Sequence, residues 1–169
     1  NVKRIVTLCP HCFNTLKNEY TQLGGSYEVR HYTEFLDELI RQGRLKPSKR
    51  VDMVMAYHDS CYLGRHNQLY DAPRRIARAI PGVSLVEMER RRERSFCCGA
   101  GGGHMWMEDS GGQRINHMRT DQFLQTRGDT LGVSCPFCLQ MFQDGIITRE
   151  VQETRRTKDL VEVLAESME

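Results

Sequence analysis

The sequence lacks a long apolar segment and an excess of charge of one sign, and its first residues do not have the pattern of a signal peptide. No uninterrupted apolar run approaches the ~18 residues of a membrane-spanning helix, and no charged and then apolar segment opens the chain. Lys and Arg number 24 against 22 Asp and Glu, so the net charge of +2 offers no electrostatic basis for binding nucleic acid. These absences predict a cytoplasmic protein that has no transmembrane segment and does not bind nucleic acid.

Low-complexity tracts are also absent, and the chain holds only five prolines and one tryptophan. Hydrophobic residues nevertheless make up 39% of the 169 residues, which is enough to form the core of a globular domain. The composition therefore excludes an intrinsically disordered chain.

Cysteine, in contrast, is abundant. Seven cysteines occur as two Cys-x-x-Cys pairs, one adjacent pair and one single residue: Cys9 with Cys12, Cys135 with Cys138, Cys97 with Cys98, and Cys61. Secreted disulfide frameworks usually have an even number of cysteines in a much shorter chain. The pattern therefore predicts reduced thiols that serve a metal site or a redox reaction.

Short apolar runs alternate with amphipathic segments along the chain. Runs rich in β-branched residues indicate buried strands, and apolar residues at helical spacing indicate helices between them. The predicted strands are "KRIVTLCP", "VDMVMAYHDSC", "VSLVEM" and "DTLGVSCP", and the predicted helices include "YTEFLDELIRQG", "DAPRRIARAIPG", "GGQRINHMRTDQFLQTRG" and "FCLQMFQDGI". This order predicts an α/β fold with an open, largely parallel sheet and flanking helices.

The two Cys-Pro-x-Cys motifs belong to an internal repeat. "IVTLCPHCFNTL" and "LGVSCPFCLQMF" share a strand, the motif and an apolar helix start, and "TEFLDELI" further on resembles "KDLVEVLA". Only the second motif has cysteines ahead of it within its own repeat. We therefore divide the chain into residues 1–50, the closing part of a first repeat, and residues 51–169, a complete second repeat. The simplest explanation is that the chain is the C-terminal part of a longer protein.

The five cysteines of the second repeat lie at predicted strand ends or in the loops just beyond them. Cys61 and Cys97 are separated by 35 residues, and Cys98 and Cys135 by 36. Because the carboxyl ends of parallel strands share one edge of a sheet, these distant thiols can converge. Five thiolates exceed the four that zinc takes, and two adjacent cysteines point in different directions, which suits two metal atoms of one cluster. The arrangement favours a multinuclear iron–sulfur site.

Three other interpretations of these motifs stay open at this point. A zinc site built on Cys-x-x-Cys is the most serious of them. The glycine-rich run after Cys98 could bind phosphate, but it lacks the glycine spacing of a dinucleotide loop and the lysine of a P-loop. The Cys-Pro-x-Cys motifs could be thioredoxin-like redox pairs, although two copies together with three further cysteines argue against this.

Three segments resemble the cysteine-rich CCG domain, namely "HDSCYLGRHNQLYDAPR", "SFCCGAGGGHMW" and "SCPFCLQMF". In this family a single cysteine, a Cys-Cys-Gly segment and a Cys-x-x-Cys pair follow one another. The domain occurs in the catalytic B subunit of heterodisulfide reductase, in iron–sulfur subunits of glycolate and lactate oxidation systems, and in membrane-associated reductases that accept electrons from electron-transfer flavoprotein. The resemblance covers residues 5 to 164, and "GRH" and "GAGGGHMW" most resemble the last branch.

The resemblance implies which residues bind the cofactor. In the heterodisulfide reductase relative each complete motif holds a non-cubane four-iron four-sulfur cluster, so the expected metal ligands here are Cys61, Cys97, Cys98, Cys135 and Cys138. Cys9 and Cys12 match only the closing pair of a preceding motif. We expect them to lie beside a second site whose other ligands come from outside these residues.

The resemblance also implies a function, namely that of an iron–sulfur electron-transfer module in a larger oxidoreductase. Electrons would arrive from a flavoprotein, such as electron-transfer flavoprotein, or from another iron–sulfur centre in other subunits, and leave to a quinone or a disulfide. A partner or an N-terminal region would hold the protein at the inner face of the membrane. Two rivals are a zinc-stabilised scaffold without catalytic function and a heterodisulfide reductase that reduces its substrate at the cluster.

Two histidines near these motifs are interpreted differently. His104 follows the glycine run and is the candidate catalytic residue, as a proton donor near a substrate. His11 lies between Cys9 and Cys12, and we expect it to be exposed rather than to bind metal.

Overall fold

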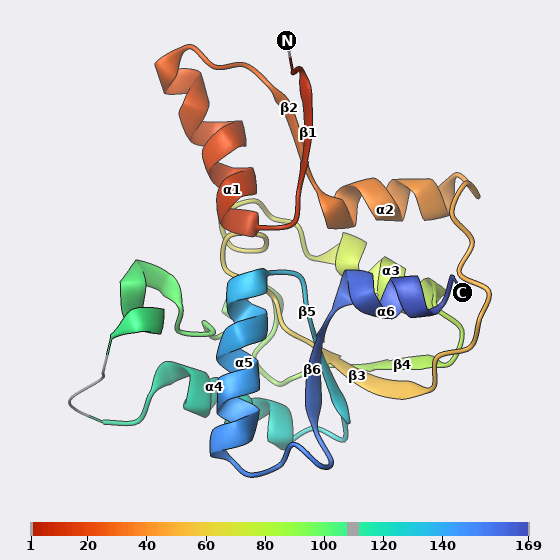
Figure 1. Ribbon diagram of the computed structural model, residues 1–169, viewed down its shortest axis with the longest axis vertical. Helices are drawn as coiled ribbons and strands as arrows, with labels where there is room; N and C mark the ends of the chain where they lie inside the picture. The colour runs from red at the N-terminus through yellow and green to blue at the C-terminus, as the bar shows by residue number, and fades with distance from the viewer. Residues whose placement is uncertain (1, 108–111, 169) are drawn as a thin grey trace.

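The computed structural model describes residues 2–107 and 112–168 and follows the alternation of strands and helices in the sequence (Figure 1). Its strands are β1 (Arg4–Thr7), β2 (Glu28–His31), β3 (Met53–Tyr57), β4 (Val83–Val86), β5 (Thr130–Val133) and β6 (Arg156–Asp159). Its α-helices are α1 (Pro10–Asn14), α2 (Tyr32–Arg41), α3 (Asp71–Ala79), α4 (Ile115–Leu124), α5 (Pro136–Thr148) and α6 (Leu160–Glu166). A π-helical turn, Thr15–Glu19, and a 3-10 turn, Tyr20–Leu23, extend α1.

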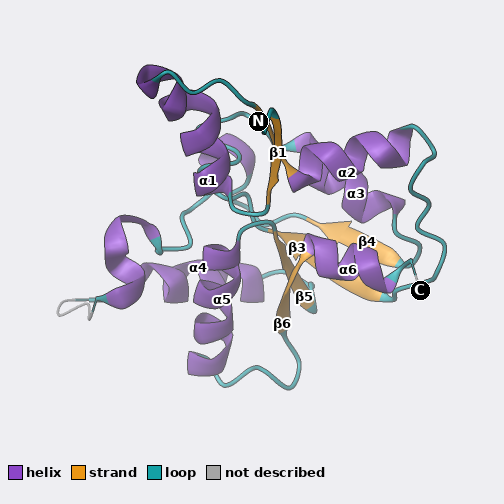
Figure 2. Ribbon diagram, turned by 45° about the horizontal axis from the view of Figure 1, so that its top comes forward, coloured by secondary structure: helices purple, strands orange, loops and turns teal. Residues whose placement is uncertain are grey.

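All neighbouring strands are parallel. The larger sheet has the order β4-β3-β5-β6, and β1 pairs with β2 in a separate sheet. Figure 2 shows this pair standing apart from the larger sheet. The α/β fold with an open parallel sheet and flanking helices is thus confirmed.

Helices cover both faces of the larger sheet. One core cluster joins the sheet to α4 and α5, and it includes Ala56, Phe123, Val133 and Phe142. A second core cluster joins the sheet to α3 and α6, and it includes Met55, Ile76 and Leu160. Met55 and Ala56 fall in different clusters because successive side chains of a strand point to opposite faces. No helix in the two described ranges combines the length and the apolar character needed to cross a bilayer.

The internal repeat has the same order of elements and the same strand register in both copies. β1 and β5 each lead into a Cys-Pro-x-Cys motif and a helix, and each pairs with the strand that follows, β2 or β6. Arg4 pairs with Glu28 at the start of β1, as Thr130 pairs with Arg156 at the start of β5. The internal repeat of the sequence is therefore also a structural repeat, of a strand–helix–strand unit.

Equivalent capping boxes begin the last helix of each copy. His31 caps α2 together with Glu34, and Asp159 caps α6 together with Glu162. The caps align residue 31 with residue 159, an offset of 128, whereas "TEFLDELI" and "KDLVEVLA" matched by letters at an offset of 125. The letter match was therefore shifted by about one helical turn.

Two strands and one helix boundary differ from the sequence prediction. β2 and β6 have the polar sequences "EVRH" and "RTKD", which carry no hydrophobic signal, and each occupies the edge of its sheet, where polar side chains are tolerated. α4 was predicted to begin in the glycines before Gln113 but begins at Ile115, because Arg114 still has an extended backbone.

Candidate metal centre

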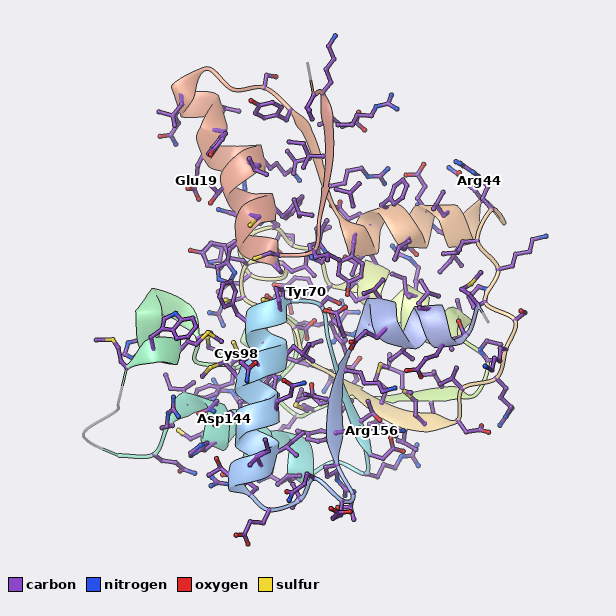
Figure 3. All side chains as sticks on the ribbon, viewed as in Figure 1. Glu19, Arg44, Tyr70, Cys98, Asp144 and Arg156 are labelled. Carbon is purple, nitrogen blue, oxygen red and sulfur yellow. The ribbon has the colours of Figure 1, made fainter. Side chains whose placement is uncertain are left out.

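Five cysteines form a continuous row of thiols at the carboxyl edge of the larger sheet. Cys61 neighbours Cys97, and Cys97 neighbours Cys98 in sequence and in space. The sulfur of Cys98 lies 3.2 Å from that of Cys138, which in turn neighbours Cys135. Figure 3 shows Cys98 beside α5. The structure thus brings together all five cysteines that the sequence predicts as ligands, and all are free thiols.

The start of α5 positions two of these thiols. Cys135 is its N-cap, with an extended backbone at φ −160° and ψ 124°, and Pro136 is its first residue. Proline is suited to that position because its φ is already helical and no intrahelical partner exists for an N–H there. Cys138 follows three residues later on the same face of the helix. Both sulfurs are therefore fixed by backbone geometry and buried.

Gly99 allows the adjacent cysteines to approach α4. Its φ is +89°, a left-handed conformation that favours glycine. A Cβ atom at this position would lie 3.0 Å from the Cβ of Ile115 and 3.2 Å from the backbone N of Asn116. The glycine of the Cys-Cys-Gly segment is thus required for both its conformation and its small size.

The thiols share their negative charge unequally. Hydrogen bonds from Cys61 and Cys98, and from the Gly99 N–H at 3.3 Å, lower the pKa of Cys97 to about 2. The pKa of Cys61 is raised because it donates to Cys97 and is partly buried. Two neighbouring thiolates in a site of low polarity repel each other, so deprotonation of the whole row requires a bound cation.

The same alternation holds at the other end of the row. A hydrogen bond from Cys138 and a weaker contribution from a hydrogen bond with His11 lower the pKa of Cys135 to about 5. The pKa of Cys138 is raised because it donates to Cys135 and Cys98 and is buried. Five soft sulfur donors, two of them poised as thiolates, fit a thiophilic metal group such as an iron–sulfur cluster or zinc.

A buried histidine completes the surroundings of the row. One ring nitrogen of His58 and the sulfurs of Cys98 and Cys138 lie within 4.8 Å of one another. The ring packs edge-on against Phe142, with 4.8 Å between the ring centres. Burial, together with the charge of Arg119, lowers the pKa of His58 to about 3. His58 is therefore neutral in the folded protein.

Cys9 and Cys12 do not join this row directly. Cys12 is exposed, and the sulfur of Cys9 lies 3.6 Å from Nδ1 of His11. Hydrogen bonds to Cys135 and Cys9 raise the pKa of His11 to about 9. His11 is half-buried and connects the two Cys-Pro-x-Cys motifs, so the expectation that it is simply exposed was wrong. Nothing in the local sequence indicates this contact, because it joins the two repeats.

The candidate proton donor lies next to the site but at the surface. His104 is exposed in the 3-10 segment Gly101–Trp106. It lines a cavity of about 200 Å³ together with Gly99, Ile115 and Met141. The cavity adjoins the Cys-Cys-Gly segment through Gly99.

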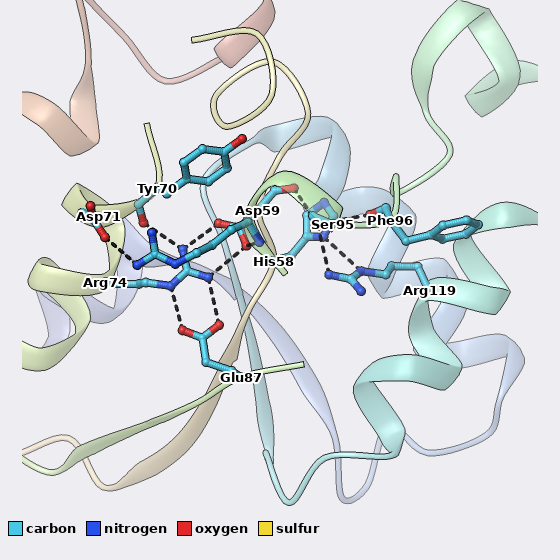
Figure 4. A network of polar contacts seen from close by, with 10 residues as sticks. His58, Asp59, Tyr70, Asp71, Arg74, Glu87, Ser95, Phe96 and Arg119 are labelled. Atoms are coloured by element: carbon cyan, nitrogen blue, oxygen red, sulfur yellow. Dashed lines mark hydrogen bonds and ion pairs between the residues drawn. The ribbon is translucent and has the colours of Figure 1, made fainter. Parts of the chain in front are cut away.

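Behind the cysteines lies a charged network that no motif in the sequence indicates. Arg74 is 1% exposed and binds both carboxylate oxygens of Asp59, at 2.6 and 2.9 Å, and both of Glu87, at 2.7 and 2.9 Å (Figure 4). The network joins the turn after β3 to α3 and to the end of β4. It thus anchors the segment that leads to Cys61.

Comparison with known proteins places the chain in a family. The model of the CCG cysteine-rich domain matches residues 55–143, more than half of the chain. The chain therefore belongs to the CCG cysteine-rich domain family, which confirms the resemblance found in the sequence.

Individual relatives are iron–sulfur and oxidoreductase proteins by name. The chain is 51% identical over 168 residues to the probable iron-sulfur-binding oxidoreductase FadF of Bacillus subtilis, covering 99% of this chain and 24% of that protein. It is 48% identical over 175 residues to the EtfAB:quinone oxidoreductase of Syntrophomonas wolfei, with the same coverage. It is 35% identical over 169 residues to a subunit of the dihydromethanophenazine:CoB–CoM heterodisulfide reductase of Methanosarcina barkeri, covering 98% of this chain and 41% of that protein. The chain thus spans about a quarter of the length of the first two relatives.

Proposed function

We propose that Cys61, Cys97, Cys98, Cys135 and Cys138 hold a non-cubane four-iron four-sulfur cluster, and that the domain passes electrons within a larger oxidoreductase. The observation that carries the proposal is the continuous row of five thiols, in which Cys98 is 3.2 Å from Cys138 although it follows directly on Cys97. A tetrahedral zinc ion takes four ligands and would leave one thiol of the row without a metal. A cluster with several metal atoms uses all five.

The protein contributes the placement and the surroundings of the ligands. Cys98, Cys135 and Cys138 are buried, which keeps water from that end of the row, whereas Cys61 and Cys97 are half-buried. When bound, the cluster accepts and releases electrons, and the surrounding protein sets its reduction potential. Cys9 and Cys12 lie beside a second such site, with His11 between it and Cys135. We assign residues 1–50 to the end of a first repeat and residues 51–169 to a complete second repeat.

The names of the relatives support a choice of donor and acceptor. Two of them are a quinone oxidoreductase named for EtfAB and a component of a heterodisulfide reductase. We infer that electrons arrive from an electron-transfer flavoprotein and leave to a quinone, with the full protein held at the inner face of the membrane through a partner or a further region. His104, at the cavity beside Gly99, would provide one of the two protons that a quinone takes up, with two electrons, when it is reduced to the quinol.

A second candidate function is reduction of a disulfide at the cluster. The contact of His11 with Cys135 favours it, because it places the two Cys-Pro-x-Cys motifs side by side, as a substrate cleft between two clusters would require. Anaerobic assays of the full protein with a quinone and with a disulfide separate the two functions. Turnover with the quinone alone supports the proposal, and turnover with the disulfide alone supports the second candidate.

The cofactor itself is tested by anaerobic reconstitution of this chain with iron and sulfide. Iron and acid-labile sulfide in equal amounts, brown colour and an electron paramagnetic resonance signal after redox poising are expected. A colourless protein that binds one zinc, and takes up no sulfide, would contradict the proposal and support a zinc-stabilised scaffold.

A further inference from the structure

Arg119, on α4, is a buried cation that forms no ion pair with a carboxylate within the described residues. Its guanidinium donates instead to neutral groups: Nδ1 of His58 at 3.4 Å, Oγ of Ser95 at 3.2 Å and Oε1 of Gln122 at 2.5 Å. Figure 4 shows Arg119 directed toward His58 and Ser95. A buried charge without a counter-ion is costly, so an anion is expected nearby.

The charged network behind the cysteines supplies part of that negative charge, because the carboxylate of Asp59 attracts Arg119 through space, but its carboxylates are hydrogen-bonded to other groups. Both carboxylate oxygens of Asp59 bind Arg74, and one also accepts the backbone N–H of Arg92 at 2.7 Å. Glu87 is bound to the same arginine through both of its oxygens. Neither carboxylate hydrogen-bonds to Arg119.

Arg119 also interacts with the thiols of the row. These interactions are electrostatic and involve Cys138 and Cys97, which lie at opposite sides of Cys98 in the row. In a buried setting the attraction between a cation and thiolates is much stronger than in water. The guanidinium is therefore placed as the counter-charge of the cysteines and of any anionic group that they bind.

Arg119 also determines which ring nitrogen of the neutral His58 carries the proton. Because Nδ1 of His58 accepts from the arginine Nε, the neutral ring carries its proton on Nε2. Nε2 is buried and has no hydrogen-bond partner within the described residues. The ring lies beside the sulfurs of Cys98 and Cys138, so its Nε2–H is available as a donor to sulfur.

We propose that Arg119 and His58 set the reduction potential of the cluster, an inference that rests on the proposed function. Gaining an electron adds negative charge to a cluster that already has thiolate ligands. A buried guanidinium, and an unpaired N–H on a ring beside the sulfurs, both stabilise that charge and so raise the potential. Arg119 acts partly through His58 and is thus a positioning residue as well as a source of charge.

The test compares reduction potentials of the reconstituted chain in four variants. Arg119→Met removes the charge and the donor to His58, Arg119→Lys keeps the charge, and His58→Phe keeps the ring volume but removes the N–H. Arg127→Met is the matched control, because it removes the same charge from an exposed position just beyond α4. Potentials are measured by anaerobic redox titration followed by electron paramagnetic resonance, with iron content measured on the same samples.

At a fixed potential the ratio of oxidised to reduced cluster should rise about tenfold in Arg119→Met, which corresponds to a potential lower by about 59 mV for one electron. Arg119→Lys and His58→Phe should show smaller decreases in potential, and Arg127→Met none, all with unchanged iron content. Equal potentials in the wild type, Arg119→Met and His58→Phe would overturn the proposal. Loss of iron in His58→Phe would also overturn it, because His58 would then be a ligand.

A second measurement needs no cluster and separates the two proposals. Long-range proton–nitrogen correlation spectra of the cluster-free protein show which nitrogen of His58 carries the hydrogen. We expect Nε2–H in the wild type and a loss of this preference in Arg119→Met. Nδ1–H in the wild type would overturn the role of Arg119 whatever the iron content. A wild type that shows Nε2–H but binds no iron would refute the proposed function, and the redox role with it, while leaving the Arg119–His58 contact established.

Discussion

The sulfur atoms of Cys98 and Cys138 lie 3.2 Å apart, although 40 positions separate the two residues in the chain. The first follows a long loop after β4, and the second lies in the first turn of α5. Their contact joins the Cys-Cys-Gly segment to the Cys-x-x-Cys motif. It therefore identifies the point where the removal of a single sulfur should matter most.

Replacement of Cys98 by serine should remove the cluster and leave the fold intact. A hydroxyl is a poor ligand for iron, whereas the core on both faces of the sheet does not depend on metal. We expect most of the iron to be lost after reconstitution, with nearly unchanged far-ultraviolet circular dichroism. Cys12→Ser is the control, since that thiol is exposed and outside the row, and it should retain iron. Full iron content in Cys98→Ser would show that this residue is not a ligand.

Replacement of Gly99 by alanine should disturb the site while all five thiols remain. The new Cβ would be strained at a φ of +89° and would press on Ile115 and Asn116, which shifts the neighbouring cysteines. Iron content should fall, and the free energy of unfolding should decrease by about 1–3 kcal/mol. Gly101→Ala is the control two residues away, because no atom lies within 4 Å of its Cβ position. If both variants bind iron equally well, the tight approach of residue 99 to α4 has no functional importance.

Replacement of Arg74 by methionine should destabilise the protein strongly. It leaves the buried carboxylate of Asp59 without its counter-ion, a change that typically costs about 3–5 kcal/mol. Arg92→Met breaks an exposed ion pair with Asp71 and should cost less than about 1 kcal/mol. Urea unfolding of the two variants measures the difference. Similar midpoints for both would mean that the buried network contributes no more than a surface ion pair.

The pH dependence of stability should contain a contribution from His31. The ring is fully buried, with Nε2 donating to the Leu8 carbonyl at 3.1 Å and Nδ1 accepting from Thr33, and burial lowers its pKa to about 4. In the unfolded chain the pKa of this histidine is about 6.5, so below that pH the unfolded chain binds a proton that the folded chain does not bind. The contribution of His31 is thus fully present above about pH 6.5 and is lost as the pH falls toward 4, at up to about 1.4 kcal/mol per pH unit.

Urea unfolding between pH 7 and pH 4 tests this dependence. His31→Asn keeps an N-cap acceptor for α2 but cannot take up the proton, so its unfolding free energy should fall less steeply with acidification. The difference between the two curves should reach the order of 3 kcal/mol near pH 4. His66→Asn, at an exposed histidine, serves as the control and should follow the wild type. Parallel curves for His31→Asn and the wild type would refute the assignment.

The sequence could predict the cysteine row because strands and cysteines alternate visibly along the chain. "VDMVMAYHDSC" and "DTLGVSCP" are apolar strands that end near Cys61 and Cys135, and parallel strands end at one edge. Polar strands gave no such signal. "EVRH" and "RTKD" form β2 and β6 through hydrogen bonds to β1 and β5, which periodicity of hydrophobic residues does not reveal.

The surroundings of the row were harder to predict, because polar residues form much of them. On α4 the buried positions include Asn116, Arg119 and Thr120, a polar stripe that faces the protein. Helical periodicity assigns such a stripe to the solvent side, so Arg119 could not be recognised. The contact of His11 with Cys135 depends on how the two repeats pack together, and no local pattern encodes it.

The separate β1–β2 sheet determines how this chain will behave in concentrated solution. β5 pairs with β6 along one side and with β3 along the other, and all four residues of β5 are buried. β1 pairs with β2 along one side only, and no described strand pairs with its other side. Val6 and, just beyond the strand, Leu8 are 51% and 59% exposed. An open apolar edge of this kind can pair with the same edge of another molecule. In isolation, the chain should therefore self-associate through this edge as its concentration rises.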